Sequence, residues 1–324
     1  MITRVPARRL IAVACAAGLA AAACSSTASP PPPGSSQAGP AGQARQAGDG
    51  TFPVTVTAAN GPVHMAKRPT AIISLAPSAT EMLYAMGAGS QVTAVDSDSD
   101  YPPAAPRTAL SGLTPNVEAI VARKPDLVVV SYDAATLTKR LAAFKIPVLG
   151  LAAPADIGGV YAQLDALGRL TGHEPQARAE VSALRRQIAT LAATAPHRAR
   201  PLTYYYELDQ TYYSVTSSTF IGRLLGLLGM KSIADSAKGA ASAGGYPQLS
   251  AEYVVKSNPD YIILADTVCC HQSASTVRSR PGWSGLAAVR AGHVIGLNDD
   301  IASRWGPRIV DLLRTVLAAV RGRE

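Results

Sequence analysis

The chain has 324 residues, of which 48% are hydrophobic and 16% are charged, and its formal net charge is +8 at pH 7. This length is sufficient for two lobes with cores of their own. Three of the positive charges (Arg4, Arg8 and Arg9) lie at the N-terminus, and the remaining excess is spread along the chain, which excludes the clustered basic face that nucleic-acid binding needs.

Residues 1–23 have the order of regions that is typical of an export signal. A basic start is followed by an apolar stretch from Leu10 to Ala23, which is too short and too rich in Ala for a membrane span. The small residues directly before Cys24 resemble the lipobox of bacterial lipoproteins, although Leu19 lies two positions further from the Cys than usual. We expect cleavage before Cys24 and lipid attachment to its sulfur. The alternative is an ordinary signal with an incidental Cys.

Residues 24–50 consist mostly of Ser, Pro, Gly, Ala and Gln, including the run from Pro30 to Pro33. Because such a segment cannot bury a core, it predicts a disordered tether. A tether behind a lipid-bearing Cys24 would hold a folded domain away from the membrane surface.

Residues 51–172 predict a first lobe in which strands and helices alternate, which is typical of a parallel sheet in an α/β fold. Ser78 lies three residues before Glu81, the spacing of a capping box at the start of a helix. Pro115 suits the first turn of a helix that carries Glu118. The expected strands cover residues 71–76, 92–96, 127–130 and 147–151, and the other expected helices cover 79–87 and 134–144.

The chain from residue 157 to residue 195 predicts helix with little interruption, divided by Gly172 and Pro175. Its second piece places Ala177, Val181, Leu184, Ile188 and Leu191 on one apolar stripe. A helix of about 20 residues spans about 30 Å. We therefore expect residues 173–196 to form a linker helix that joins two lobes as a stiff spacer.

Residues 197–324 predict a second lobe that repeats one unit of the first. Glu118 precedes Pro125-Asp126 and a buried strand by seven residues, and Glu252 precedes Pro259-Asp260 and another buried strand by the same spacing. The repeat predicts two similar lobes with a ligand-binding cleft between them. The expected strands cover residues 202–208, 261–265 and 293–297, and the expected helices cover 219–228, 250–257, about 273–290 and 307–320.

No local motif supports catalysis or a resident cofactor. The chain lacks a Gly-x-Ser-x-Gly elbow and a phosphate-binding loop, and its five His residues show no ligand spacing. We therefore expect no catalytic residue, no cofactor and no bound metal. A first-row metal site assembled from distant parts of the chain is the alternative.

Polar and aromatic side chains follow several predicted strands, and ligands of open α/β sheets bind beyond the carboxyl ends of the strands. Aromatic faces with a few polar groups suit a large, rigid, partly apolar ligand. The alternative for each Tyr is a half-buried core position. Arg304 could clamp an anion or stack on a ring, or else form a surface ion pair. The candidate ligand-binding residues are Pro77, Ser78, Tyr101, Tyr132, Tyr213, Tyr246, Arg304 and Trp305.

Cys269 and Cys270 are adjacent in one of these loops. Either they form a strained disulfide ring, which would be a stiff apolar plate in the cleft, or they pack as two small hydrophobic side chains.

Glu118 and Glu252 also allow two interpretations. An acid in the first turn of a helix is stabilising through the helix dipole. Alternatively, the two carboxylates, one on each lobe, could engage basic residues of a partner.

Residues 60–321 resemble the Fe³⁺-siderophore/vitamin B12 class of ABC-importer periplasmic solute-binding lipoproteins. The resemblance is carried by the run from Ile72 to Glu81, by Ser99-Asp100-Tyr101-Pro102-Pro103, by the two Glu to Pro-Asp units, and by Arg304-Trp305-Gly306-Pro307-Arg308. The Ser-Asp-Tyr-Pro-Pro loop is most similar to that of vitamin B12-binding proteins. Where those proteins often carry Trp, this chain has Leu113, Tyr132 and Tyr246.

The resemblance implies a monomer with two α/β lobes joined by a long helix and a ligand held between the lobes with little hinge motion. It implies that Glu118 and Glu252 dock on arginines of the membrane permease, that the only membrane attachment is the lipid on Cys24, and that this chain does no catalysis. The implied ligand is cobalamin or a ferric siderophore, with haem as an alternative. Rival functions are an exported enzyme on the same fold and a sensor lipoprotein that has lost transport.

Overall fold

The structure is a computed structural model that describes residues 51–321. The predicted signal, Cys24 and the predicted tether up to residue 50 lie outside the described residues. Among the described residues, no helix is long and apolar enough to cross a membrane.

The first lobe contains a five-stranded, wholly parallel sheet with the strand order β5-β4-β3-β6-β7. Its strands are β3 (Ile72–Leu75), β4 (Val92–Asp96), β5 (Arg107–Leu110), β6 (Leu127–Val130) and β7 (Val148–Gly150). Between them lie α1 (Pro77–Ala85), the 3₁₀ helix η1 (Ala88–Gln91), α2 (Val117–Val121) and α3 (Ala134–Ala142). The expected parallel α/β fold is confirmed, and β5 is an edge strand that the sequence pattern did not predict.

A short antiparallel hairpin precedes this sheet and was also not predicted. It consists of β1 (Val54–Ala58) and β2 (Gly61–Met65). The side chain of Asn60 at its turn fastens it to the sheet: the amide nitrogen donates to the carbonyl of Val148 (2.8 Å), and the amide oxygen accepts from the N–H of Gly150 (2.8 Å).

The second lobe contains a four-stranded parallel sheet with the order β11-β10-β8-β9. Its strands are β8 (Leu202–Glu207), β9 (Met230–Ser232), β10 (Tyr261–Leu264) and β11 (Val294–Gly296). In both lobes the chain places its second strand on one side of the first and then crosses to the other side. The helices are α6 (Phe220–Gly226), η2 (Ile233–Ser236), α7 (Ala251–Ser257), α8 (Ala274–Ser279), η3 (Trp283–Gly285), α9 (Ala287–Arg290) and α10 (Asp299–Ser303).

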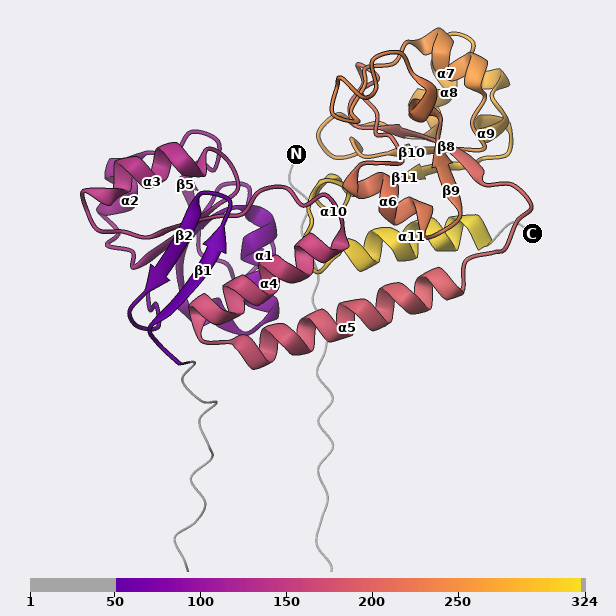
Figure 1. The fold of residues 1–324 in the computed structure, drawn as a ribbon. Helices are drawn as coiled ribbons and strands as arrows, with labels where there is room; N and C mark the ends of the chain where they lie inside the picture. The colour runs from indigo at the N-terminus through magenta and orange to yellow at the C-terminus, as the bar shows by residue number, and fades with distance from the viewer. Residues whose placement is uncertain (1–50, 322–324) are drawn as a thin grey trace, which may run out of the picture. The chain divides into compact units, whose positions relative to one another are not determined.

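One long helix, α5 (Glu174–Ala193), extends along both lobes (Figure 1). It packs against α4 (Ile157–Thr171) of the first lobe and α11 (Ile309–Arg321) of the second. Gly172 separates α4 from α5 in the left-handed conformation (φ 73°), which glycine adopts without steric cost. The apolar stripe predicted on α5 is the face that is buried, with Ala177 and Leu184 in the core.

The largest hydrophobic core is continuous from one lobe to the other. It joins Ile72 and Met82 of the first lobe to Leu184 of α5 and to Tyr206 and Leu313 of the second lobe. Alternate strand residues turn away from it into two outer cores, one per lobe, because successive side chains of a strand point to opposite faces. The buried strands therefore read as continuous apolar runs.

The repeated Pro-Asp units perform the same local task in both lobes. The carboxylate of Asp126 accepts from the backbone N–H groups of Thr70 (2.8 Å) and Ala71 (3.0 Å), at the start of β3. The carboxylate of Asp260 accepts from the N–H of Thr203 (2.8 Å) in β8. Each Asp thus fastens the central strand of its sheet to the strand that follows the Asp, which explains why the unit occurs twice.

The expected capping box at Ser78 and Glu81 is wrong. Helix α1 begins at Pro77, its N-cap is Ala76, and no side chain caps it. The Ser78 hydroxyl instead accepts from the backbone N–H of Trp305 (3.1 Å), and Glu81 forms ion pairs with residues near the C-terminus. The motif spacing is present, but both side chains are engaged by the other lobe.

Candidate functional site

The carboxyl ends of the central strands mark where a ligand is expected. In each lobe the chain reverses its direction of strand addition beside the first strand, between β3 and β6 and between β8 and β10. Ligands of open α/β sheets bind in the crevice outside such points. The loops concerned begin after Leu75, Val130, Glu207 and Leu264.

A cavity of about 280 Å³ lies where loops of the two lobes meet. Four of the eight predicted ligand-binding residues come together in it: Pro77 and Ser78 from the first lobe, and Arg304 and Trp305 from the second. Four further residues complete the lining and were not singled out as candidates, namely Asp98, Ser131, Asp300 and Ser303.

The guanidinium of Arg304 is held by acidic and carbonyl groups from both lobes. It contacts the carboxylates of Asp100 (2.7 Å) and Asp300 (2.5 Å), the carbonyl of Asp98 (2.7 Å) and, more distantly, Glu81 (3.4 Å). Its side chain is only 10% exposed. The ion-pair alternative therefore describes Arg304 better than the anion clamp, but the pairs are buried and join the lobes instead of lying on the surface.

The two carboxylates that share Arg304 differ in their titration. Burial acts to raise the pKa of Asp100, but the hydrogen bond and charge of Arg304 outweigh it and lower that pKa. For Asp300, burial dominates and raises the pKa, with the neighbouring charge of Asp100 adding to the shift. Asp300 is thus the carboxylate at the cavity wall whose negative charge is the more weakly held.

Glu81 is the second point at which the lobes are linked. Its side chain is 2% exposed, and it pairs with Arg308 at 2.5 Å. The Arg308 guanidinium also lies over the ring of Tyr101, 4.1 Å from the ring centroid. Helix α1 supplies Glu81, and the segment before α11 supplies Arg308, so the ion pair crosses from one lobe to the other.

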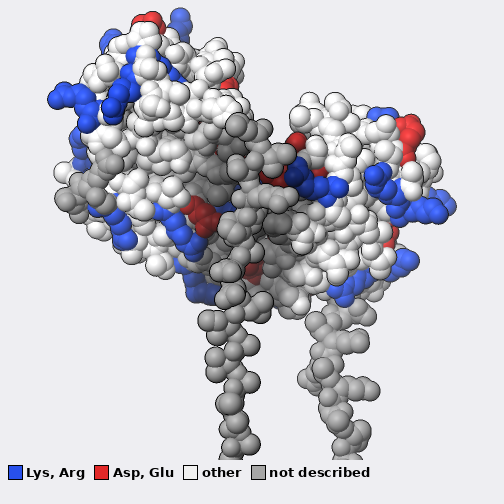
Figure 2. Space-filling model, turned by 180° about the vertical axis from the view of Figure 1, so that it is seen from behind, with Lys and Arg blue, Asp and Glu red and all other residues white. Residues whose placement is uncertain are grey.

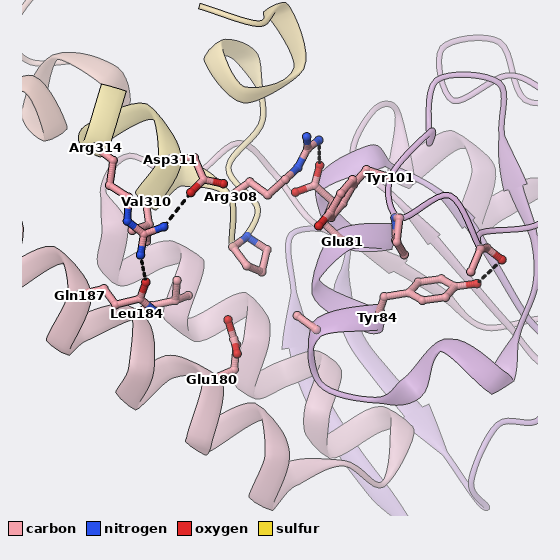
Figure 3. A pocket seen from close by; sticks show the side chains of 14 residues that line it. Glu81, Tyr84, Tyr101, Glu180, Leu184, Gln187, Arg308, Val310, Asp311 and Arg314 are labelled. Carbon is pink, nitrogen blue, oxygen red and sulfur yellow. Dashed lines mark hydrogen bonds and ion pairs between the residues drawn. The ribbon is translucent and has the colours of Figure 1, made fainter. Parts of the chain in front are cut away.

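Tyr101 lies in a different pocket from the four residues gathered at Arg304. This pocket has a volume of about 540 Å³ and is lined by residues of α1, α5 and α11 and of the loop from Tyr101 to Ala104. Figure 3 shows Tyr101 beside Glu81 and Arg308, with Glu180 of α5 standing apart from them. The structure therefore does not bring Tyr101 together with Ser78 and Trp305.

Trp305 is fixed by both lobes. Its indole N–H donates to the side-chain oxygen of Gln163 in α4 (3.0 Å), and its backbone N–H donates to Ser78. Its ring is partly buried against the shared core. Trp305 can therefore offer only part of its ring to a ligand.

The remaining predicted aromatic residues are exposed. The exposed fractions are 58% for Tyr132, 41% for Tyr213 and 43% for Tyr246. The segments that carry Tyr213 and Tyr246 run side by side, joined by a bridge between Tyr213 and Gln248 and by a backbone hydrogen bond between Thr216 and Gly245. Half-burial in the core, the alternative for each Tyr, does not describe these three.

Two exposed apolar residues in the same set of loops were not among the candidates. Leu113 follows β5 and is 66% exposed, and Val268 follows β10 and is 58% exposed. For Val268, its position after the expected strand at residues 261–265 was the available signal. Leu113, in contrast, follows β5, an edge strand that the sequence pattern did not predict.

Two buried acids, Glu207 and Asp266, lie at the base of the loop after β10. Glu207 is fully buried and forms a two-pronged ion pair with Arg280 (2.5 Å for each contact). Asp266 is also fully buried, and neither of its carboxylate oxygens has a hydrogen-bond partner in another described residue. Burial raises the pKa of Asp266 to about 7, and the charge of Glu207 adds to the shift. The sulfurs of Cys269 and Cys270, a few residues later, are joined as a disulfide.

Glu118 and Glu252 occupy equivalent positions. Each is the second residue of its helix, α2 or α7, after an N-cap side chain that accepts a backbone N–H: Asn116 from Ala119 (2.9 Å) and Ser250 from Tyr253 (3.1 Å). Both carboxylates are exposed, as an acid that contacts a partner must be.

Charges elsewhere are dispersed. Figure 2 shows Lys and Arg side chains in separate groups over both lobes of the face in view, with no single continuous basic patch. Within residues 51–321, no group of three or more His, Cys, Asp and Glu side chains is placed to hold a metal ion.

The sequence matches the family described as periplasmic binding protein over residues 72–301. An uncharacterized ABC transporter substrate-binding lipoprotein of Bacillus subtilis, YvrC, is 30% identical over 270 residues, which cover 80% of this chain and 83% of the relative. A cobalamin-binding protein of Halobacterium salinarum is 32% identical over 272 residues, 81% of this chain and 72% of the relative. A solved structure of a possible iron-binding, periplasmic solute-binding protein from Staphylococcus epidermidis has a TM-score of 0.67 and 25% identity, covering 79% of this chain and 100% of the other.

Proposed function

The chain belongs to the periplasmic binding protein family, and from this we propose that it is the substrate-binding lipoprotein of an ABC importer whose ligand is a cobalamin. The observation that carries the proposal is the cavity built from the carboxyl-end loops of both lobes, with exposed aromatic residues in the neighbouring loops. Similarity to a relative named as cobalamin-binding supports the choice of ligand. We expect the chain to bind and deliver its ligand without catalysis.

The charges at the cavity favour a cobalamin over an anionic chelate. Four acids, Glu81, Asp98, Asp100 and Asp300, lie at or beside the cavity. The basic groups of Arg304, which lines the cavity, and of nearby Arg308 are already paired with three of these acids, Glu81, Asp100 and Asp300. A ligand that carries carboxylates, such as haem or many ferric siderophores, would meet an excess of negative charge. A macrocycle with neutral amide side chains would not, and amides can accept from or donate to Ser78, Ser131 and Ser303.

A titration with three probes tests the ligand. Purified protein is titrated with cyanocobalamin, haemin and a ferric hydroxamate siderophore by isothermal titration calorimetry. We expect cyanocobalamin to bind with a dissociation constant of about 1 μM or less, equivalent to about −8 kcal/mol, and the other two to bind at least tenfold more weakly. A preference for haemin or the siderophore would overturn the choice of ligand and leave the receptor function in place. Binding to none of the three would remove both.

Glu118 and Glu252 are proposed to dock the receptor on basic residues of the permease. The support is their exposure and their equivalent place on the two lobes, which gives one acid per lobe for a partner with two matching sites. The double variant Glu118→Ala, Glu252→Ala should keep its affinity for the ligand and lose most uptake into cells. Asp165→Ala, which removes an exposed acid from α4, is the matched control and should leave uptake unchanged. Normal uptake by the double variant would exclude the docking role.

Anchoring through Cys24 is part of the same proposal. Its support is the order of signal regions before Cys24 and the lipoprotein name of the relative from B. subtilis. A Cys24→Ala variant should fail to incorporate a labelled fatty acid and should appear in the medium instead of the membrane fraction. Labelling that persists in this variant would show that the lipid is attached to a residue other than Cys24.

A further inference from the structure

The loop from Asp266 to Gln272 is closed at its base. The N–H of Gln272 donates to the carbonyl of Asp266 (3.3 Å), and the side-chain oxygen of Gln272 accepts from Arg280 (2.7 Å). Arg280 is in turn held by the buried Glu207. The base of the loop is therefore tied to the end of β8, the central strand of the second sheet.

The tip of the same loop is fastened to helix α10, which also lines the cavity. The carboxylate of Asp299 accepts from the backbone N–H groups of Val268 (2.9 Å) and Cys269 (2.7 Å). Asp299 is the first residue of α10, and the next residue, Asp300, lines the cavity together with Ser303 of the same helix. The loop tip is thus fixed to the helix that lines the cavity.

The tip presents an apolar surface that the fold itself does not use. Val268 is 58% exposed, Cys269 is exposed and Cys270 is half-buried, and the disulfide between the two Cys residues removes both thiol hydrogens. A loop held at both ends by hydrogen bonds does not need an exposed apolar tip for stability. Exposed apolar groups at a fixed place beside a cavity are typical of a surface that contacts a ligand.

We propose that the tip formed by Val268, Cys269 and Cys270 is a wall of the ligand site, and that its disulfide makes ligand capture sensitive to redox state. The inference rests on the proposed function and adds a contact surface and its control. An external dithiol would supply two electrons and two protons: the Cys269–Cys270 bond breaks, two thiols form, and the reductant becomes a disulfide. The reduced tip loses its covalent ring and gains two polar hydrogens, so it offers the ligand a more mobile and less apolar surface.

Two valines of the same lobe give a matched pair for the test. Val268 follows β10 at its carboxyl end, whereas Val255 lies in α7 before the strand and is 36% exposed. We expect Val268→Ser to weaken cyanocobalamin binding about five- to tenfold, because a side chain that becomes buried against the ligand loses apolar area. Val255→Ser should bind like the unaltered protein. Equal affinities for both variants and the unaltered protein would overturn the inference.

The redox part is tested on the disulfide itself. Cys269→Ser with Cys270→Ser should weaken binding by a similar five- to tenfold factor, with circular dichroism confirming that the fold is kept. In the unaltered protein, saturating cyanocobalamin should slow the reaction of these two sulfurs with dithiothreitol at least fivefold, measured by alkylation and peptide mass. Unchanged affinity in the double variant, or an unchanged reaction rate, would remove the redox role.

The outcomes separate this inference from the proposed function. If the unaltered protein binds cyanocobalamin and the tip variants bind equally well, only the inference fails. If the unaltered protein binds neither cyanocobalamin nor the other two probes, the proposed function fails and the inference fails with it. If haemin or the siderophore is the ligand that binds, the same variants are titrated with that probe, and the same fold-changes are expected.

Discussion

Replacing Glu81 by Gln should destabilise the whole protein, because this carboxylate links the lobes from a buried position. Its side chain is 2% exposed and pairs with Arg308 at 2.5 Å and with Arg304 at 3.4 Å. Removing one partner of a buried ion pair costs about 3–5 kcal/mol, since the other charge is left without compensation. Arg304 keeps two other carboxylates and Arg308 keeps the ring of Tyr101, so we expect the lower end of this range, about 3 kcal/mol.

Urea denaturation followed by tryptophan fluorescence measures this loss. One of the two Trp residues, Trp305, contacts both lobes, and the other, Trp283, lies in the outer core of the second lobe. With a slope of about 3 kcal/mol per M of urea, a loss of about 3 kcal/mol lowers the midpoint by about 1 M. The continuous core predicts that both Trp residues report one transition.

Glu180→Gln is the matched control in the same pocket. Burial raises the pKa of Glu180, so its ionised form is disfavoured in the folded state, and loss of its charge should be neutral or slightly stabilising at pH 7. A cost of less than about 1 kcal/mol for Glu81→Gln, or equal midpoint shifts for both variants, would show that Glu81 does not link the lobes.

Three further predictions concern the titration of single acids and the packing of the linker helices. The hydrogen bond from Arg200 lowers the pKa of Asp260 to about 2, so its stabilisation is present above the unfolded value of 3.8 and is lost as the pH falls towards 2. Asp260→Asn should therefore cost about 1–2 kcal/mol at pH 7 after allowance for solvent around Arg200, and the cost should shrink between pH 4 and pH 2 in urea titrations. For Asp266 the folded pKa of about 7 lies above the unfolded value, so ionisation opposes folding increasingly from pH 4 to pH 7. The free energy of unfolding of Asp266→Asn, relative to that of the unaltered protein, should therefore rise by about 2 kcal/mol between pH 5 and pH 8. A difference that is independent of pH would contradict this. A Cβ on Gly168 would overlap the Cβ of Ala177 where α4 meets α5. Gly168→Ala should therefore lower the stability by about 1–2 kcal/mol, measured by thermal unfolding. An unchanged unfolding midpoint would mean that the two helices separate easily.

The central strands were predictable because their local signal agrees with their environment. The aliphatic runs at residues 127–130 and 261–264 are strands as expected, since both faces of a parallel sheet are covered and continuous apolar runs fit only there. The short edge strands β5 and β9 and the β1–β2 hairpin carry mixed residues, and their pairing depends on a neighbour that the local pattern does not reveal.

The candidate site was predictable only in part, because its geometry depends on contacts between residues far apart in the chain. Ser78 and Glu81 have the spacing of a cap, yet their partners, Trp305 and Arg308, lie 227 positions away in each case. Position after a strand selected Pro77, Ser78, Arg304 and Trp305, which line one cavity, but it could not show that Tyr101 lies with Arg308 in a separate pocket.

The continuous core that includes α4, α5 and α11 limits how far the two lobes can move apart. Swinging the lobes far apart would expose this core to water at a cost of about 25 cal/mol per Å². Under the proposed function, the ligand-bound and ligand-free forms should therefore differ little in shape. A permease that recognised only the shape of the protein would then bind both forms, and the ligand-free form would compete for its binding sites. Under the proposed function, uptake should therefore fall when the receptor is produced in large excess over its ligand.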